Sequence, residues 1–383
     1  MQHPADAEDA ETITTHFEYH CMEDNLLKLD MLGHDDPSMI RMLEDLTGVN
    51  ARAIPLDDPD TMSIFTSSKV LGFENDELLG PTGAVAIPEF NTRFTRQMLI
   101  DTQPKDFNTL VRLSGFSHGT DVWLGNAREL IVGGTASVLQ TVGCRDDIML
   151  YLISMGLDPK MSFKIMEAVR KGKVKKGGFQ EGWVEAMEEH GVPQWYIESL
   201  AKIGYLFPKA HAVAYVMMAF RIAWFKVHEP LAFYATFFTI RAKAFDAEFC
   251  CAGKEAVEKK IHEIENNKDA TAVEQNLLVT LEVCYEFYLR GFHFDTIDIY
   301  RSDASKFIIT EGGLLPPLIS VHGLGEAAAQ DTVEKRKGKT FISVEEFSMC
   351  CSKLSKTHIE QLKALGAFAG MADTSQVNLF DGL

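Results

Sequence analysis

Three polar side chains stand at the opening of a long apolar segment. Lys209, His211 and Tyr215 follow Pro208, and the chain then continues through mostly apolar residues to Phe225. Proline suits a helix start because its ring fixes φ and its missing N–H costs nothing there. The free amides at such a start favour a phosphate, and Lys209 adds a full charge at the same place. Because Tyr215 comes four residues after His211, the two share one helical face.

A cation, an imidazole and an aromatic ring at a helix start could hold a nucleotide by its phosphates and its base. The alternative is a buried helix with a polar cap. This segment taken alone leaves both interpretations open.

A carboxylate lies on a predicted strand near the N-terminus. Residues 26–32 alternate as a strand does, Asp30 lies among them, and Gly33 ends the pattern. A carboxylate with apolar neighbours is costly unless it is paired or binds a metal, and Mg²⁺ prefers such oxygen ligands. Two-metal phosphoryl transfer needs two or three carboxylates, and this strand supplies one. Asp30 pointing to solvent is the alternative. The Asp-x-Asp at 58–60 opens a predicted helix, which favours capping over metal binding.

Residues 321–325, Val-His-Gly-Leu-Gly, precede a predicted amphipathic helix and have the form of a helix-hairpin-helix turn. Gly323 and Gly325 would let backbone amides approach a DNA phosphate with no Cβ in the way. Lys335 and Arg336 lie just beyond and could add charge. An ordinary connection before a helix has the same spelling, so the motif alone is weak.

The net charge of −18 argues against a protein that is basic overall, as phosphate contacts normally require. The charge is uneven, however. Residues 1–60 hold 15 Asp or Glu against 3 Lys or Arg, whereas residues 164–176 hold six Lys or Arg against one Glu. Lys171 and Lys173 in this basic run are candidates for DNA contact, and a solvated helix end is the alternative.

The last residues include Gln376, Leu379 and Phe380. Adjacent Leu and Phe on a flexible end are unfavourable unless a partner groove or the chain's own domain receives them, and both remain open.

Composition bounds the class of protein. A length of 383 residues predicts two or three domains, and 46% hydrophobic residues supply ample core. No run of about 20 apolar residues lacks a charge or breaker, and the acidic start does not resemble a signal peptide, so we expect a soluble, cytoplasmic protein without membrane contact. The seven cysteines have no zinc spacing and are expected to be free thiols.

The elements that must position these residues are mostly helices. Helical patterns run from 37 to 47 and, with breaks, from about 57 to 240, followed by helices at 256–266, 271–289 and 326–335. Short β-like pieces are expected around Ile297, Ile299 and Tyr300 and at 307–309. The predicted fold class is therefore multidomain and mainly α, with small β elements.

Several passages together resemble the C-terminal part of the PolC-type DNA polymerase III alpha subunit, a C-family bacterial replicative polymerase. The resemblance covers nearly the whole chain. Its specific passages are residues 24–37, 87–93, 113–126, 143–147, 207–211 and 376–380.

The resemblance implies a division of the chain and roles for its residues. Residues 1–36 would be the remnant of a palm with its last catalytic Asp strand, 37–240 the fingers, 241–372 a duplex-binding region with the helix-hairpin-helix, and 373–383 a flexible clamp-binding tail. Asp30 would be the last of three carboxylates that hold two Mg²⁺ ions. The implied partners are primer–template DNA, deoxynucleoside triphosphates (dNTPs), a sliding clamp and, as a further option, a separate chain that carries the rest of the polymerase.

Within the fingers, the resemblance makes Arg145 and Lys209 candidates for phosphate contact, and Tyr215 a candidate for packing against the nascent base pair. His211 is expected in the same dNTP site, which the segment 114–121 would also line. Gln376, Leu379 and Phe380 would bind the clamp.

The sequence departs from the family in the parts that it does not include. The other two catalytic carboxylates belong to an Asp-x-Asp on a palm strand that these residues do not include, so the 383 residues alone are expected to extend no primer. The alternative function is a non-catalytic helix-hairpin-helix DNA-binding module tethered to the clamp. A helix-hairpin-helix glycosylase is a third class, but it needs a catalytic Asp or Lys just after the turn, where this chain has Glu326, Ala327 and Ala328.

Overall fold

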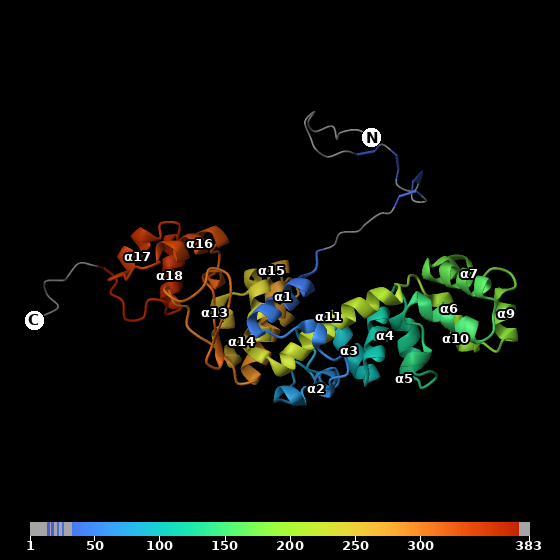
Figure 1. Ribbon diagram of the computed structural model, residues 1–383. Helices are drawn as coiled ribbons and strands as arrows, with labels where there is room; N and C mark the ends of the chain where they lie inside the picture. The colour runs from blue at the N-terminus through green and yellow to red at the C-terminus, as the bar shows by residue number, and fades with distance from the viewer. Residues whose placement is uncertain (1–13, 16, 19–20, 23–24, 27–32, 375–383) are drawn as a thin grey trace, which may run out of the picture. The chain divides into compact units, whose positions relative to one another are not determined.

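The computed structural model describes residues 14–15, 17–18, 21–22, 25–26 and 33–374. The chain divides into two units, Met1–Asp35 and the much larger Asp36–Leu383. That unit is mainly helical (Figure 1). Its α-helices are α1 (Asp35–Thr47), α2 (Pro59–Ser63), α3 (Arg93–Thr102), α4 (Phe107–His118), α5 (Arg128–Val132), α6 (Arg145–Ser154), α7 (Pro159–Arg170), α8 (Lys173–Gly177), α9 (Trp183–Glu189), α10 (Gln194–Lys202), α11 (Lys209–His228), α12 (Pro230–Ile240), α13 (Ala247–Cys250), α14 (Lys254–Asn266), α15 (Ala272–Leu289), α16 (Glu326–Lys335), α17 (Val344–Cys350) and α18 (Lys356–Ala364).

Short polar side chains fix where many of these helices begin. Asp58 accepts a hydrogen bond from the Thr61 amide at 2.8 Å, which confirms capping rather than metal binding by the Asp-x-Asp at 58–60. Thr271 and Glu274 form a reciprocal capping box at the start of α15. The helices predicted at 37–47, 256–266, 271–289 and 326–335 are confirmed, with boundaries within two residues.

The core is built around α11 and α12. Helix α11 packs against α2, α4 and α12, and its Phe220 and Phe225 are fully buried. Phe233 and Phe238 of α12 are buried as well. Each such side chain contributes about 1.5–3 kcal/mol by leaving water.

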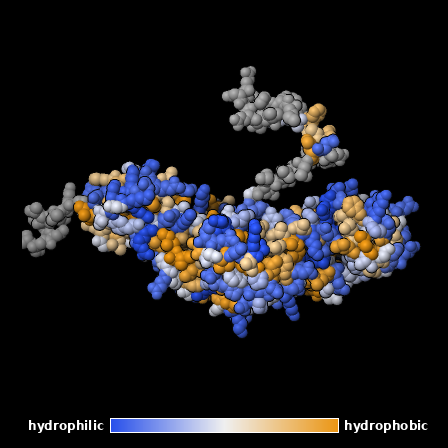
Figure 2. Space-filling model, in the orientation of Figure 1, coloured by the Kyte–Doolittle hydropathy of each residue, from blue (hydrophilic) through white to orange (hydrophobic). Residues whose placement is uncertain are grey.

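Helix α11 is also, among the described residues, the one helix long and apolar enough by length and composition to cross a membrane. Its packing against α2, α4 and α12 makes it a core helix of this unit. On the face shown in Figure 2, apolar residues form separate patches divided by hydrophilic surface.

A small sheet follows α15. Strand β3 (Gly313–Leu315) is central, with β1 (His293–Phe294) parallel to it and β2 (Ile308–Thr310) antiparallel. The strand expected around Ile297 and Ile299 is wrong, because both residues are buried in an irregular connection. No strand was predicted from the sequence at the position of β3.

The C-terminal region combines a 3₁₀ turn, η7 (Leu318–Ser320), with α16, α17 and α18. Phe347 of α17 packs against residues on both sides of it in the chain. Its ring centroid lies 5.2 Å from that of Phe341 and 5.2 Å from that of Phe368. All seven cysteines are free thiols, as expected.

Candidate functional site

The start of α11 differs in detail from the expected open phosphate site. Pro208 is the residue before the helix, and Lys209 is its first residue. The Lys209 amide donates to the Asp146 carboxylate of α6 at 2.7 Å, so one of the amides predicted to be open already has an acceptor. An incoming phosphate would therefore depend on the side chains of Lys209 and Arg145 more than on the helix end.

Arg145 lies at the start of α6, close to the same place. Its amide donates to the Phe207 carbonyl at 3.1 Å, which ties the start of α6 to the segment before α11. Its guanidinium is about a third exposed and lies 4.0 Å from Asp146. The two predicted phosphate contacts, Arg145 and Lys209, are thus brought to neighbouring helix starts that share Asp146.

Rings from three segments meet beside this point. His211 lies 4.5 Å from Tyr215 and 5.0 Å from Phe207, measured between ring centroids. His118, the last residue of α4, lies 5.3 Å from His211. The structure therefore brings together the predicted residues His211 and Tyr215, and it places the end of the 114–121 segment against them.

Glu89 completes this cluster and was missed at the sequence level. Its carboxylate lies 2.5 Å from His118 Nε2 and accepts a hydrogen bond from Ser114 Oγ at 3.0 Å. The hydrogen bond with Glu89 raises the pKa of His118, although burial opposes it. Burial would raise the pKa of Glu89, but the hydrogen bonds and charge of its neighbours, led by His118, lower it overall. The pair therefore favours a carboxylate beside an imidazolium.

A buried ion pair holds the loop that carries Glu89. Lys226 Nζ of α11 lies 2.7 Å from Glu286 Oε1 of α15, with both side chains fully buried. Lys226 also donates to the carbonyls of Gly83 and Val85, at 2.8 and 2.6 Å. Tyr234 donates to Glu286 at 2.7 Å. Burial lowers the pKa of Lys226 to about 8, although Glu286 opposes this shift.

Two glycines explain how closely α4 approaches the start of α6. A Cβ on Gly115 would lie 2.2 Å from the Gly143 carbonyl oxygen, which no side chain tolerates. Arg112 lies 2.5 Å from Asp147, and Asp147 accepts the Gly143 and Cys144 amides at 3.0 and 2.9 Å. These contacts lock the backbone that presents Arg145.

The turn before α16 is open at both of its glycines. Gly323 has a φ of +76°, and Gly325 is the residue before the helix. Both glycines are exposed, while Leu324 between them is buried. A Cβ on Gly325 would meet nothing within 4 Å, so its surroundings are open.

The basic residues near this turn differ in accessibility. Arg336 is 9% exposed and donates to the carbonyls of Ile299 and Ser302. Its burial argues against a phosphate contact, and its hydrogen bonds indicate a structural role. Lys335 is partly exposed and pairs with Asp331 at 3.1 Å.

The basic run at 164–176 covers the end of α7 and the short helix α8. Lys171 pairs with Glu167 at 3.1 Å, and Lys173 is exposed. Lys175 pairs with Asp121 at 2.6 Å. Carboxylates thus already offset part of this charge.

Four predicted site residues, Asp30, Gln376, Leu379 and Phe380, lie outside the described residues. Within the described ranges, no three His, Cys, Asp or Glu side chains gather to hold a metal ion. The described residues therefore do not fit a metal centre, and no step through Mg²⁺ is assigned to them.

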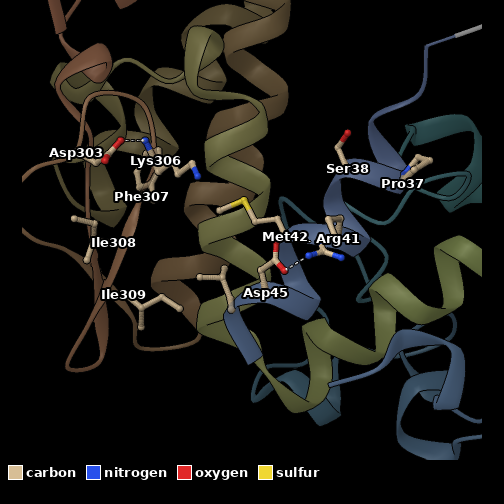
Figure 3. Close-up of a pocket in the computed structure, with 11 residues that line it drawn as sticks. Pro37, Ser38, Arg41, Met42, Asp45, Asp303, Lys306, Phe307, Ile308 and Ile309 are labelled. Atoms are coloured by element: carbon tan, nitrogen blue, oxygen red, sulfur yellow. Dashed lines mark hydrogen bonds and ion pairs between the residues drawn. The ribbon is translucent and has the colours of Figure 1, made fainter. Parts of the chain in front are cut away.

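A separate surface pocket of about 700 Å³ lies between α1 and the β2 region (Figure 3). Arg41 and Asp45 pair at its α1 wall, 3.0 Å apart, and Phe307 and Ile308 line the other side. It shares no residue with the cluster around His211.

Comparisons with known proteins agree with this arrangement. Residues 36–191 match the family model described as the bacterial DNA polymerase III alpha subunit finger domain, and residues 291–377 match a helix-hairpin-helix motif. The chain is 56% identical over 381 residues to the DNA polymerase III PolC-type of Caldanaerobacter subterraneus subsp. tengcongensis. It is 50% identical to that of Halalkalibacterium halodurans and 51% identical to that of Bacillus cereus. These matches cover 99% of this chain but only 26–27% of each relative, so the chain spans about a quarter of their length.

Proposed function

Since this chain is homologous along nearly its whole length to a part of PolC-type DNA polymerase III, we propose that it is the nucleotide-selecting and duplex-binding part of a replicative DNA-directed DNA polymerase. The observation that carries the proposal is the meeting of His118, His211 and Tyr215 next to the helix starts that carry Arg145 and Lys209. A base can stack on the rings while the triphosphate reaches the cations. We place the protein in the cytoplasm, as expected for replication.

The domain boundaries remain part of this proposal. Residues 37–240 form the fingers, 241–372 the duplex-binding region and 373–383 the clamp-binding tail, while 1–36 belong to the palm. In the whole polymerase, Mg²⁺ ions assist attack of a primer 3′-hydroxyl on the α-phosphate of the dNTP. Asp30 is proposed as one metal ligand on the resemblance alone.

The proposal is tested by nucleotide binding. Equilibrium dialysis of the 383-residue polypeptide against labelled dNTP and Mg²⁺ should detect saturable binding that all four bases compete for, because stacking accepts any base. Arg145→Ala and Lys209→Ala should each weaken it. Absence of saturable binding at millimolar dNTP would remove the nucleotide site from the proposal.

A polypeptide of these 383 residues alone should extend no primer. One proposed carboxylate cannot replace the two or three that two-metal transfer requires. Incubation with primer–template DNA, dNTPs and Mg²⁺, followed by gel electrophoresis, checks this expectation. Any Mg²⁺-dependent extension that Asp30→Asn abolishes would show that the remaining ligands are present in this chain.

The Gly325 turn offers a clean test of duplex binding. Gly325→Ala adds a methyl group at an open position without positive φ, so the thermal midpoint should hold while duplex affinity falls. Binding should also weaken as salt rises, because phosphate contacts release counterions. Gln330→Ala, which changes an exposed residue on the following helix α16, serves as the control. Equal affinity for Gly325→Ala and Gln330→Ala would count against phosphate contact at this turn.

The tail is proposed to dock into a sliding clamp and so keep the polymerase on DNA by effective concentration. Replacing Leu379 and Phe380 together by Ala should abolish clamp binding in surface plasmon resonance and leave duplex binding intact. Clamp affinity that survives this double change would remove the tail from the account. Duplex and clamp binding without any nucleotide binding would favour the alternative, a non-catalytic helix-hairpin-helix module.

A further inference from the structure

We propose that Glu89 is a positioning residue that holds the His118 imidazole as a cation facing the triphosphate of the bound nucleotide. This inference rests on the proposed nucleotide site and goes beyond it, because it makes nucleotide affinity depend on a pair of titratable side chains. Glu89 was not among the candidates that the sequence supplied, and His118 was included only as part of the segment 114–121, with no role of its own.

The backbone around Glu89 is strained at two residues. Glu89 has a φ of +69° and Ala86 has a φ of +61°, a region that side-chain-bearing residues adopt at a cost of about 1–3 kcal/mol. The Ala86 amide donates to Asn91 Oδ1 at 2.8 Å, and Lys226 holds the preceding carbonyls of Gly83 and Val85. Strained residues persist only where the surroundings determine them, and they cluster at functional sites.

This loop aims Glu89 at one ring. The Glu89 side chain is 11% exposed and His118 is 32% exposed, so the carboxylate is sheltered while the imidazole still reaches solvent. Ser114 Oγ, one turn earlier on α4, donates to the same carboxylate oxygen that contacts His118. With Nε2 bound to Glu89, an imidazolium keeps a second N–H donor on its other nitrogen.

The titratable groups around His118 come from each packed element. The loop supplies Glu89, and α11 supplies His211 and Tyr215, whose rings lie 5.3 and 6.5 Å from the His118 ring. The charge of His211 also helps to lower the pKa of Glu89. The carboxylate therefore lies among imidazoles and balances positive charge at the place where a triphosphate would arrive.

Nucleotide affinity should depend on pH through the charge of His118. Because Glu89 raises the pKa of His118, the imidazolium persists to higher pH than an isolated histidine would allow. Affinity for a triphosphate should be greatest below that raised pKa and should fall as pH rises through it. Removing the Glu89 charge should move this fall to lower pH.

The test combines histidine NMR with nucleotide binding on the full 383-residue chain. His118 is assigned from the His118→Asn spectrum and titrated in the wild type, in Glu89→Gln and in the control Glu185→Gln, an exposed change on α9. Glu89→Gln should lower the pKa of His118, so that more of the imidazole is neutral at neutral pH. Binding of dTTP and of inorganic tripolyphosphate should then weaken by about threefold to tenfold, because one positive charge on His118 is lost. Glu185→Gln should change neither.

A double variant separates positioning from general damage. In the His118→Asn background, Glu89→Gln should have no further effect on affinity, and binding should lose its pH dependence in this range. The inference is overturned if Glu89→Gln leaves the His118 titration and the binding profile unchanged, or if its effect persists without His118. If the wild type binds no triphosphate at any pH, the proposed function fails and the inferred role of Glu89 fails with it. The NMR titration still shows in that case whether Glu89 raises the pKa of His118.

Discussion

Lys226→Ala is expected to destabilise the chain by about 3–5 kcal/mol, because it leaves the Glu286 charge buried without its partner. The same change orphans the carbonyls of Gly83 and Val85, to which Lys226 donates. Urea denaturation followed by circular dichroism measures the loss. Lys259→Ala is the matched control, since the Lys259 side chain is 80% exposed and its ion pair is long, at 4.0 Å.

The loss should extend to function because the released loop carries Glu89. In any Lys226 variant that still folds, nucleotide affinity should fall as it does in Glu89→Gln. Replacing Lys226 by Met and Glu286 by Leu together should recover only part of the stability, because the Tyr234 hydroxyl also loses its acceptor. A destabilisation by Lys226→Ala no larger than that of Lys259→Ala would contradict the proposed anchoring role.

Tyr215→Ala should lower nucleotide affinity by about 1–3 kcal/mol, roughly 5- to 150-fold, which is the range for stacking of one base on an aromatic ring. Tyr215→Phe keeps the ring and should retain most of the affinity. Isothermal titration with dNTP and Mg²⁺ measures both variants. Phe163→Ala removes a half-exposed ring from α7, outside the cluster, and is the control. If Tyr215→Ala binds like Phe163→Ala, Tyr215 does not contact the base.

Much of the helical framework could be predicted because its signals are local. The caps at Asp58 and Thr271 and the apolar periodicity of α1 and α14 depend on residues within a few positions of one another. The three-residue strand β3 could not be predicted in this way. It exists because β1 and β2, up to 20 residues earlier along the chain, supply its hydrogen-bond partners.

In the candidate site, too, local relations were predicted and contacts between distant residues were missed. His211 and Tyr215 were predicted together because a spacing of four puts them on one helical face. Glu89 was missed because its partner His118 is 29 residues away and its loop has no periodic pattern. Lys226 was not among the predicted site residues, because only tertiary packing places Glu286 of α15 against it. Arg336 looked accessible in a basic stretch, yet its guanidinium is buried against two carbonyls.

We propose that a nucleotide binds where α4, α6 and α11 meet, at the residues around His118, Arg145 and His211. Hydrogen–deuterium exchange of the 383-residue chain, with and without saturating dNTP and Mg²⁺, tests this location most directly. We expect slower exchange in peptides that cover 114–121, 143–147 and 207–215, with no change in α14 or α16 to α18. Unchanged exchange in all three segments under conditions of demonstrated binding, or protection confined to another region, would contradict it.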